Sequence, residues 1–222
     1  MASEWPAGRE EATLDLDPKL LRRAAAHLRR RDPVLARIIA EVGPCRLRVE
    51  RGGGPFSALV ESIVYQQITG RAAATIHGRL CALAGGRRPR PEDIARASDA
   101  ALRKAGLSRQ KIGYLRDLTS RAREGLPLGR ISRLPDEAVI EALTAVKGIG
   151  RWTAEMFLIF RLGRLDVLPV DDYGIRKAMQ KAYRKRALPK ADWMRRQAEP
   201  WAPYRTVASW YLWRSLDGPG GD

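Results

Sequence analysis

The feature that most constrains this chain is a tight glycine turn between two apolar helical patterns. The segment spans Leu143–Phe157, and the turn has the sequence Val-Lys-Gly-Ile-Gly. Gly148 and Gly150 allow unusual backbone dihedrals and the close approach of another molecule. They also leave backbone N–H groups at the start of the second helix, where the helix dipole favours an anion such as phosphate. The pattern predicts a helix–turn–helix unit that binds a phosphate, with Lys147 and Arg151 beside it.

A pair of carboxylates follows the turn. Asp171 and Asp172 lie about 20 residues after Gly150, directly before a pattern of helical spacing. Aspartate is a favoured N-cap, so either residue is also explained as the start of a helix. A carboxylate close to a bound phosphate stabilises positive charge that develops on a sugar. The two motifs together indicate chemistry on a nucleic acid.

The charge balance agrees with a nucleic-acid partner. The 222 residues include 41 lysines and arginines against 25 aspartates and glutamates, for a net charge of +16. Such a surface attracts a polyanion. An arginine-rich genome explains the same excess without any partner, so the charge supports this interpretation without establishing it.

Several other classes of protein are disfavoured. Cys45 and Cys81 are too few for a disulfide framework or a four-cysteine iron–sulfur cluster. His27 and His77 are far apart in the sequence, so we expect no metal site built on them. The chain has no run of about 18 apolar residues and no apolar signal segment. We therefore expect a cytoplasmic protein of bacterial type with no membrane partner.

Almost every apolar pattern has helical spacing. Residues 56–68 mark a strongly apolar helix, and Ser108 is expected to cap a helix that carries Ile112, Leu115 and Leu118. Strand-like alternation is nearly absent, which predicts an all-α protein. Residues 1–16 are polar and acidic and are expected to form a flexible leader, with residues 218–222 as a tail.

Several blocks, in the right order, resemble the helix-hairpin-helix (HhH-GPD) DNA glycosylases, whose members share a Gly/Pro-rich loop and a catalytic aspartate. The blocks are Val146–Ala154 with Val170–Tyr173, Gly54–Gln67 and Gly106–Lys111. They cover about residues 50–216, and the chain is most similar to the 3-methyladenine DNA glycosylase II type.

The resemblance implies two helical lobes with an active-site cleft between them. A six-helix bundle over residues 54–164 would carry the helix-hairpin-helix at about 138–162. Residues 17–53 and 165–217 would form the second lobe. An additional N-terminal α/β domain, which some relatives carry, is not expected.

The resemblance assigns catalysis to Asp172 and leaves Asp171 as a cap or structural residue. A carboxylate beside the sugar stabilises the positive charge that develops as a glycosidic bond breaks, and it orients water. Bifunctional relatives have a lysine at the position of Trp152, and this lysine attacks the sugar as an amine. Trp152 therefore predicts a monofunctional enzyme without lyase activity.

An alkylated purine carries a positive charge, which the faces of aromatic rings attract. The resemblance gives Trp210 as the stacking floor of a base pocket, and the other residues of the pocket are Trp152, Tyr173, Tyr211 and Met156. Each ring is also explained by ordinary core packing. Met156 stands where some relatives have an aromatic residue, which leaves the range of bases open.

The target base must leave the duplex, so a side chain has to fill the gap. Gln66 and Gln67 follow the apolar helix at the place where this family has its wedge. Gln67 aligns with a leucine of some relatives. The two glutamines are also explained as the end of the helix.

At the hairpin, the resemblance implies a DNA phosphate and a monovalent cation. The N–H groups of Gly148 and Gly150 would donate to the phosphate, with Lys147 and Arg151 as neighbours. Na⁺ or K⁺ would be held by backbone carbonyls, which by position belong to Thr144, Val146 and Ile149. No cofactor is expected to be required, and no iron–sulfur cluster is expected.

The resemblance thus implies a monomeric, monofunctional DNA glycosylase used at the nucleoid in base excision repair. It would act on double-stranded DNA containing damaged bases and remove alkylated purines such as 3-methyladenine and 7-methylguanine. The alternatives are a glycosylase of the same fold for hypoxanthine, etheno adducts or uracil, and a non-catalytic DNA-binding module. Surface arginines such as Arg87 and Arg88 have no assigned role.

Overall fold

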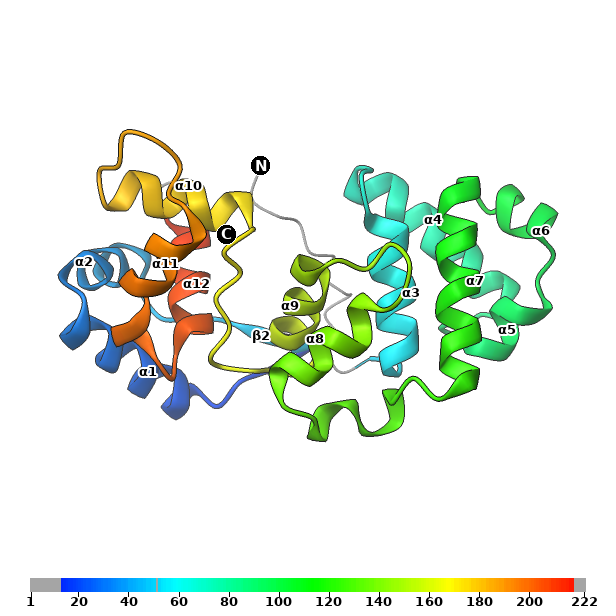
Figure 1. The fold of residues 1–222 in the computed structure, drawn as a ribbon, viewed down its shortest axis with the longest axis horizontal. Helices are drawn as coiled ribbons and strands as arrows, with labels where there is room; N and C mark the ends of the chain where they lie inside the picture. Colours follow the sequence, from blue (N-terminus) through cyan, green and yellow to red (C-terminus); the bar gives the residue numbers. More distant parts are fainter. Residues whose placement is uncertain (1–12, 51, 218–222) are drawn as a thin grey trace. The chain divides into compact units, whose positions relative to one another are not determined.

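Helices dominate the structure, a computed structural model that describes residues 13–50 and 52–217 (Figure 1). The prediction of an all-α protein is confirmed. The predicted tail, residues 218–222, and the first twelve residues of the predicted leader lie outside the described residues. In the part of the chain that the structure covers, no helix combines the length and the apolar character needed to cross a membrane.

The prediction of a flexible leader up to residue 16 is wrong for its last part. Strand β1, Thr13–Asp15, pairs antiparallel with strand β2, Arg48–Glu50. Leu14 lies opposite Val49, which is buried. Alternation over three residues is too short to be distinguished from a loop, which explains why the pattern gave no strand here.

The chain divides into two compact units. Unit 1 contains the described residues 13–50 and 158–217, and unit 2 contains 52–157. The second division falls inside helix α9, between Phe157 and Leu158, and not at residue 165 as the resemblance implied.

Unit 1 surrounds helix α12, which packs against α1, α2 and α10 (Figure 1). Helices α1 and α2 each begin with a proline, whose fixed φ suits the first helical turn. The helices and the short 3-10 helix of this unit are α1 (Pro18–Arg31), α2 (Pro33–Val42), α10 (Tyr173–Ala182), α11 (Ala191–Gln197), η3 (Glu199–Trp201) and α12 (Arg205–Arg214).

Unit 2 is built around helix α3, which is apolar on all sides and is buried from Phe56 to Val64. The predicted cap is confirmed, because the Ser108 hydroxyl accepts a hydrogen bond from the backbone N–H of Lys111. The elements of this unit are α3 (Pro55–Tyr65), α4 (Gly70–Leu83), α5 (Pro91–Arg96), α6 (Asp99–Lys104), α7 (Arg109–Glu124), η2 (Leu128–Arg133), α8 (Asp136–Thr144) and most of α9 (Arg151–Phe160).

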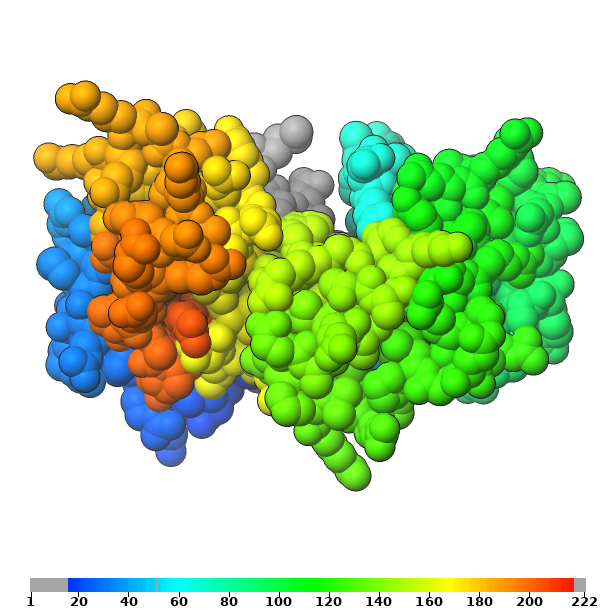
Figure 2. All heavy atoms as spheres, in the orientation of Figure 1, coloured from blue at the N-terminus to red at the C-terminus, as the bar shows by residue number. Residues whose placement is uncertain are grey.

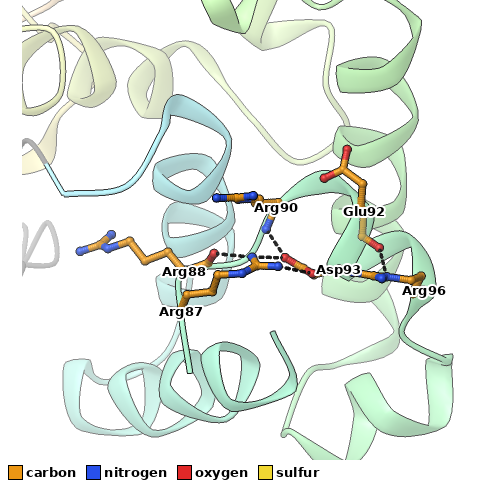
Figure 3. Close-up of polar contacts among 6 residues, drawn as sticks. All are labelled: Arg87, Arg88, Arg90, Glu92, Asp93 and Arg96. Carbon is orange, nitrogen blue, oxygen red and sulfur yellow. Dashed lines mark hydrogen bonds and ion pairs between the residues drawn. The ribbon is translucent and has the colours of Figure 1, made fainter. Parts of the chain in front are cut away.

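Two of the unassigned arginines stabilise the loop before α5 (Figure 3). The Arg87 guanidinium binds the carboxylate of Asp93, which also accepts a hydrogen bond from the backbone N–H of Arg90 at 2.8 Å. Arg88 forms an ion pair with the buried Glu61 of α3 at 2.9 Å. Because their charges are neutralised within the protein, Arg87 and Arg88 have a structural explanation.

Candidate active site

Asp172 begins helix α10 in unit 1 and is buried, with 3% of its surface exposed. Its Oδ1 accepts a hydrogen bond from the backbone N–H of Ile175 at 2.8 Å. The same oxygen accepts a second bond from the indole Nε1–H of Trp213 at 2.9 Å. Asp172 is therefore the N-cap of α10, and the exposed Asp171 is not. The two bonds fix the direction of the carboxylate, which a group that stabilises a developing charge requires.

The partner of Asp172, Trp213, is a residue that sequence reasoning missed. Its ring is buried and stacks on Phe160, with the ring centroids 5.8 Å apart. The indole reaches Asp172 because Gly174 has no side chain: a Cβ there would lie 3.0 Å from Asp172 Oδ1 and 3.1 Å from the Trp213 ring. The one signal in the sequence is that Trp213 follows Trp210 by three residues, so both lie on neighbouring parts of one helix face.

The aromatic residues predicted for a base pocket in unit 1 differ in exposure. Tyr173, the first residue of α10, is 62% exposed. Trp210 is half-buried, with its ring 5.1 Å from Tyr211 and the Arg214 guanidinium 5.9 Å from its centroid. Tyr173 and Trp210 are thus accessible to a ligand.

Tyr211 is a core residue of unit 1 rather than a wall of a base pocket. It is 1% exposed, and its hydroxyl donates a hydrogen bond to the carbonyl of Gly43 at 3.0 Å. Burial raises the pKa of this hydroxyl well above its ordinary value. Tyr211 follows Trp210 directly, and consecutive residues of a helix point about 100° apart.

The two pocket residues predicted in unit 2 lie on the first part of α9. Trp152 is half-buried in the first turn of the helix. Met156 is fully buried, so it belongs to the core of the unit and does not line a pocket. The apolar pattern of α9 could not separate these positions, because a buried ring and a ligand-binding ring have the same hydropathy.

The predicted hairpin joins α8 to α9, and the yellow-green segment that holds its turn lies at the surface of unit 2 (Figure 2). Gly148 has a φ of +80°, and a Cβ at this position would overlap the ring of Tyr114 from α7. Gly150 has open space around it. The first glycine is therefore required by the fold, whereas the second leaves the backbone open to an approaching molecule.

Helix α7 also holds the hairpin through Asp117. Its Oδ2 accepts a hydrogen bond from the backbone N–H of Lys147 at 2.8 Å and pairs with Arg121. Burial raises the pKa of Asp117, but these hydrogen bonds outweigh it and hold the pKa below its ordinary value. The turn is thus fixed in place before any ligand binds, with the Lys147 side chain exposed.

Arg151 does not have the surroundings of a simple phosphate neighbour. Its guanidinium is bound by Glu137 of α8 at 2.6 Å and by Glu155 of α9 at 3.1 Å. These two carboxylates hold its pKa above the ordinary value, with the hydrogen bond from Glu137 as the largest cause. Arg151 therefore links the two helices of the hairpin, and the prediction of a free cation at this position is wrong.

The backbone of the turn fits the geometry of a monovalent cation site in one respect. Val146 lies at the end of the first helix, and its carbonyl accepts one hydrogen bond, from the N–H of Ile149 at 3.1 Å. A carbonyl oxygen has two lone pairs, so Val146 retains acceptor capacity. Within the described residues, no group of three or more His, Cys, Asp or Glu side chains is placed to hold a metal ion.

The structure distinguishes Gln66 from Gln67. The Gln66 amide donates a hydrogen bond to the carbonyl of Gly148 at 2.8 Å, which ties the end of α3 to the hairpin. Lys111 donates to the carbonyls of Val64 and Gln66 at 2.6 and 2.7 Å. Gln67 is exposed and has a φ of +58°, an unusual conformation for a residue other than glycine. Gln66 is thus an anchor, and Gln67 projects from the turn.

The family model described as "HhH-GPD superfamily base excision DNA repair protein" matches residues 60–203. DNA-3-methyladenine glycosylase 1 of Schizosaccharomyces pombe is 35% identical over 212 residues, which cover 91% of this chain and 93% of the relative. The structure is similar to that of 3-methyladenine DNA glycosylase from the same yeast in complex with abasic DNA, with a TM-score of 0.76, 34% identity, and coverage of 88% and 97%. A DNA-3-methyladenine glycosidase from Bacillus halodurans gives a TM-score of 0.80 with 38% identity and 93% of each chain covered.

The chain therefore belongs to the HhH-GPD superfamily of base excision DNA repair proteins. Within this superfamily it is of the DNA-3-methyladenine glycosylase type, and the resemblance stated from the sequence is confirmed.

Proposed function

We propose that this protein is a monofunctional DNA glycosylase that excises alkylated purines from double-stranded DNA. The observation that carries the proposal is Asp172, a buried carboxylate whose direction is fixed by Ile175 and Trp213. Its position matches the catalytic aspartate of the family motif. The relatives named 3-methyladenine DNA glycosylases support the alkylated purine as substrate class.

The chemistry asked of Asp172 is electrostatic. When the bond between sugar and base breaks, positive charge develops on the sugar, and a carboxylate beside it lowers the energy of the transition state. Water completes the reaction at the sugar carbon and leaves an abasic site. A cationic alkylated base is already a good leaving group, so the enzyme has little need of a strong general acid.

The hairpin supplies the grip on the DNA backbone. The N–H groups of Gly148 and Gly150 would donate to a phosphate, with the exposed Lys147 as an additional cation. A monovalent cation would be held by the carbonyls of Val146 and its neighbours, where it would neutralise phosphate charge. Phosphate binding of this kind becomes weaker as the salt concentration rises.

The difference between Gln66 and Gln67 assigns the wedge to Gln67. Its side chain is free to enter the base stack, whereas the amide of Gln66 is bound to the hairpin. Because Gln66 connects the wedge turn to the phosphate-binding turn within unit 2, the position of the wedge is fixed relative to the bound phosphate.

A panel of duplexes, each with one lesion, tests the proposed substrate class. We expect fast excision of 3-methyladenine and 7-methylguanine, with slower or no excision of hypoxanthine, etheno adducts and uracil. Borohydride added during the reaction should trap no covalent complex, because Trp152 offers no amine. Preferred excision of a neutral lesion would redirect the proposal to that lesion, and a trapped complex would overturn the monofunctional mechanism.

Trp213→Phe is expected to lower the single-turnover rate of base release roughly tenfold, because Asp172 loses a hydrogen bond that fixes its direction. DNA affinity should change little. Trp193→Phe, an indole on α11 in the same unit, serves as the control. An unchanged rate in Trp213→Phe would show that the indole N–H does not position the carboxylate.

Gly148→Ala is expected to weaken the binding of duplex DNA by about tenfold or more. Alanine at a φ of +80° is strained, and its Cβ would displace Tyr114 from the turn. Fluorescence anisotropy with a labelled duplex measures the effect. Gly150→Ala is the matched control, since its Cβ meets open space in the free protein. Equal affinity for the wild type and Gly148→Ala would contradict this account of the hairpin.

Gln67→Ala is expected to reduce excision from fully paired duplexes by about tenfold, and much less from a lesion that faces a mismatch, because unstacking is already easier there. Gln66→Ala should instead weaken DNA binding to both substrates alike, since it releases the wedge turn from the hairpin. The comparison needs single-turnover rates on the two substrates. The same pattern in both variants would refute the assignment of the wedge.

A further inference from the structure

Unit 1 contains a cavity of about 1080 Å³ that the proposed activity does not use. One face of α1 forms one wall, and the end of α2 with the segment 43–48 forms the other. Tyr211 lies at the bottom. Every described residue that lines the cavity belongs to this unit.

The floor and the rim of this groove differ in chemistry. Leu21, Ile39 and Leu47 are buried apolar residues of the floor, and the small side chain of Ala25 leaves the space open. Burial raises the pKa of the Cys45 thiol to about 12, so Cys45 remains uncharged and adds to this apolar surface. The rim holds exposed arginines, namely Arg22, Arg29, Arg30, Arg46 and Arg48. Among the described residues of the lining there is no carboxylate.

Helix α12 separates the groove from Asp172. Trp213 donates its N–H to Asp172, whereas Tyr211 donates its hydroxyl to Gly43 at the groove. Two residues apart on a helix, these side chains point about 200° away from each other. A DNA strand that presents a nucleotide to Asp172, as the proposed function requires, therefore leaves the groove open.

We propose that this groove is a docking site for an acidic peptide segment of a partner protein that carries apolar side chains. The arginine rim attracts carboxylates and sets the orientation of the segment. The apolar floor takes up leucine or phenylalanine side chains, whose burial supplies most of the affinity.

Charge complementarity with an apolar floor favours a peptide over nucleic acid. A DNA backbone is charged along its whole length and offers no aliphatic side chain to an apolar floor. An acidic peptide that alternates carboxylates with apolar residues matches both the rim and the floor. A partner that binds here remains compatible with DNA at the other side of α12.

The test is a titration of the full chain with a fluorescein-labelled peptide of alternating aspartate and phenylalanine or leucine residues. We expect saturable binding, and roughly tenfold weaker binding by Arg22→Glu/Arg29→Glu. The matched control is Arg23→Glu/Arg37→Glu, which makes the same charge change at exposed positions of α1 and α2 outside the groove. A peptide with serine in place of the apolar residues should bind more weakly to the wild type.

Each other occupant gives a distinct result that overturns the proposal. Equal loss in the two double variants would reduce the binding to nonspecific charge attraction. Competition by undamaged duplex DNA, with weaker DNA binding only in Arg22→Glu/Arg29→Glu, would make the groove a phosphate site. A tenfold gain in peptide affinity on deletion of residues 1–12 would identify the acidic N-terminal segment of this chain as the occupant. Base release from methylated DNA by Arg22→Glu/Arg29→Glu should equal that of the control, and this holds whether or not the proposed lesion specificity is correct.

Discussion

Asp172→Asn is expected to lower the rate of base release by about 10²–10⁴-fold, because asparagine cannot supply the negative charge that stabilises the sugar cation. The substitution keeps the shape of the side chain. The amide oxygen of asparagine can still accept hydrogen bonds from Ile175 and Trp213, and asparagine is a favoured N-cap. Fold and DNA affinity should therefore be close to those of the wild type.

Single-turnover kinetics on a duplex with one alkylated purine measure this effect, and anisotropy on the same duplex measures binding. Asp171→Asn is the control, since Asp171 is exposed and does not cap α10. A rate in Asp172→Asn within a few-fold of the wild type, with Asp171→Asn reduced instead, would move the catalytic role to the first aspartate.

Asp32→Ala is expected to cost about 3–5 kcal/mol of stability, the largest loss from a single side chain of unit 1. Asp32 is 4% exposed and caps α2 through the N–H groups of Val34 and Leu35. Its Oδ2 accepts hydrogen bonds from three side chains far away in the sequence, Tyr183 at 2.6 Å, Trp201 at 3.0 Å and Gln197 at 3.2 Å. Removal of the carboxylate leaves these buried donors without their acceptor.

Urea unfolding at neutral pH measures the loss in Asp32→Ala. Asp17→Ala is the matched control, because Asp17 is also an N-cap but is exposed, with one bond to Lys19 at 2.8 Å. We expect a loss of about 1 kcal/mol there. Similar losses in the two variants would show that the buried contacts of Asp32 contribute little beyond the cap.

The pH dependence of the same pair has a defined sign. Burial raises the pKa of Asp32, but the hydrogen bonds from Tyr183, Trp201 and the backbone outweigh it and place the pKa below the ordinary value of 3.8. A lowered folded-state pKa stabilises the protein above the unfolded value, and this contribution is lost as the pH falls through the folded value. The difference in unfolding free energy between the wild type and Asp32→Ala should therefore be largest above pH 4 and shrink below it.

The elements that the sequence predicted best are those defined by local rules. The cap at Ser108, the hairpin glycines and the cap at the start of α10 all follow from residues within a few positions of one another. Catalysis by Asp172 came from an ordered set of motifs and remains a prediction.

Other features depend on packing between distant segments, which no local pattern encodes. Trp213 meets Asp172 from 41 positions away, and the pairing of Arg151 with Glu137 depends on how the hairpin closes. Tyr211 was placed in a base pocket because neighbouring aromatic residues cannot be told apart until the helix face is known. The direction of each side chain on α12 resolves that ambiguity.

The most direct test of the central claim is one reaction with two readouts. The purified full chain is incubated with methylated duplex DNA, free bases are identified by mass spectrometry, and the DNA strand is examined for breaks before and after alkali. The account predicts free 3-methyladenine or 7-methylguanine, with strands that stay intact until alkali cleaves the abasic sites. Absence of any released base while salt-sensitive DNA binding persists would contradict it.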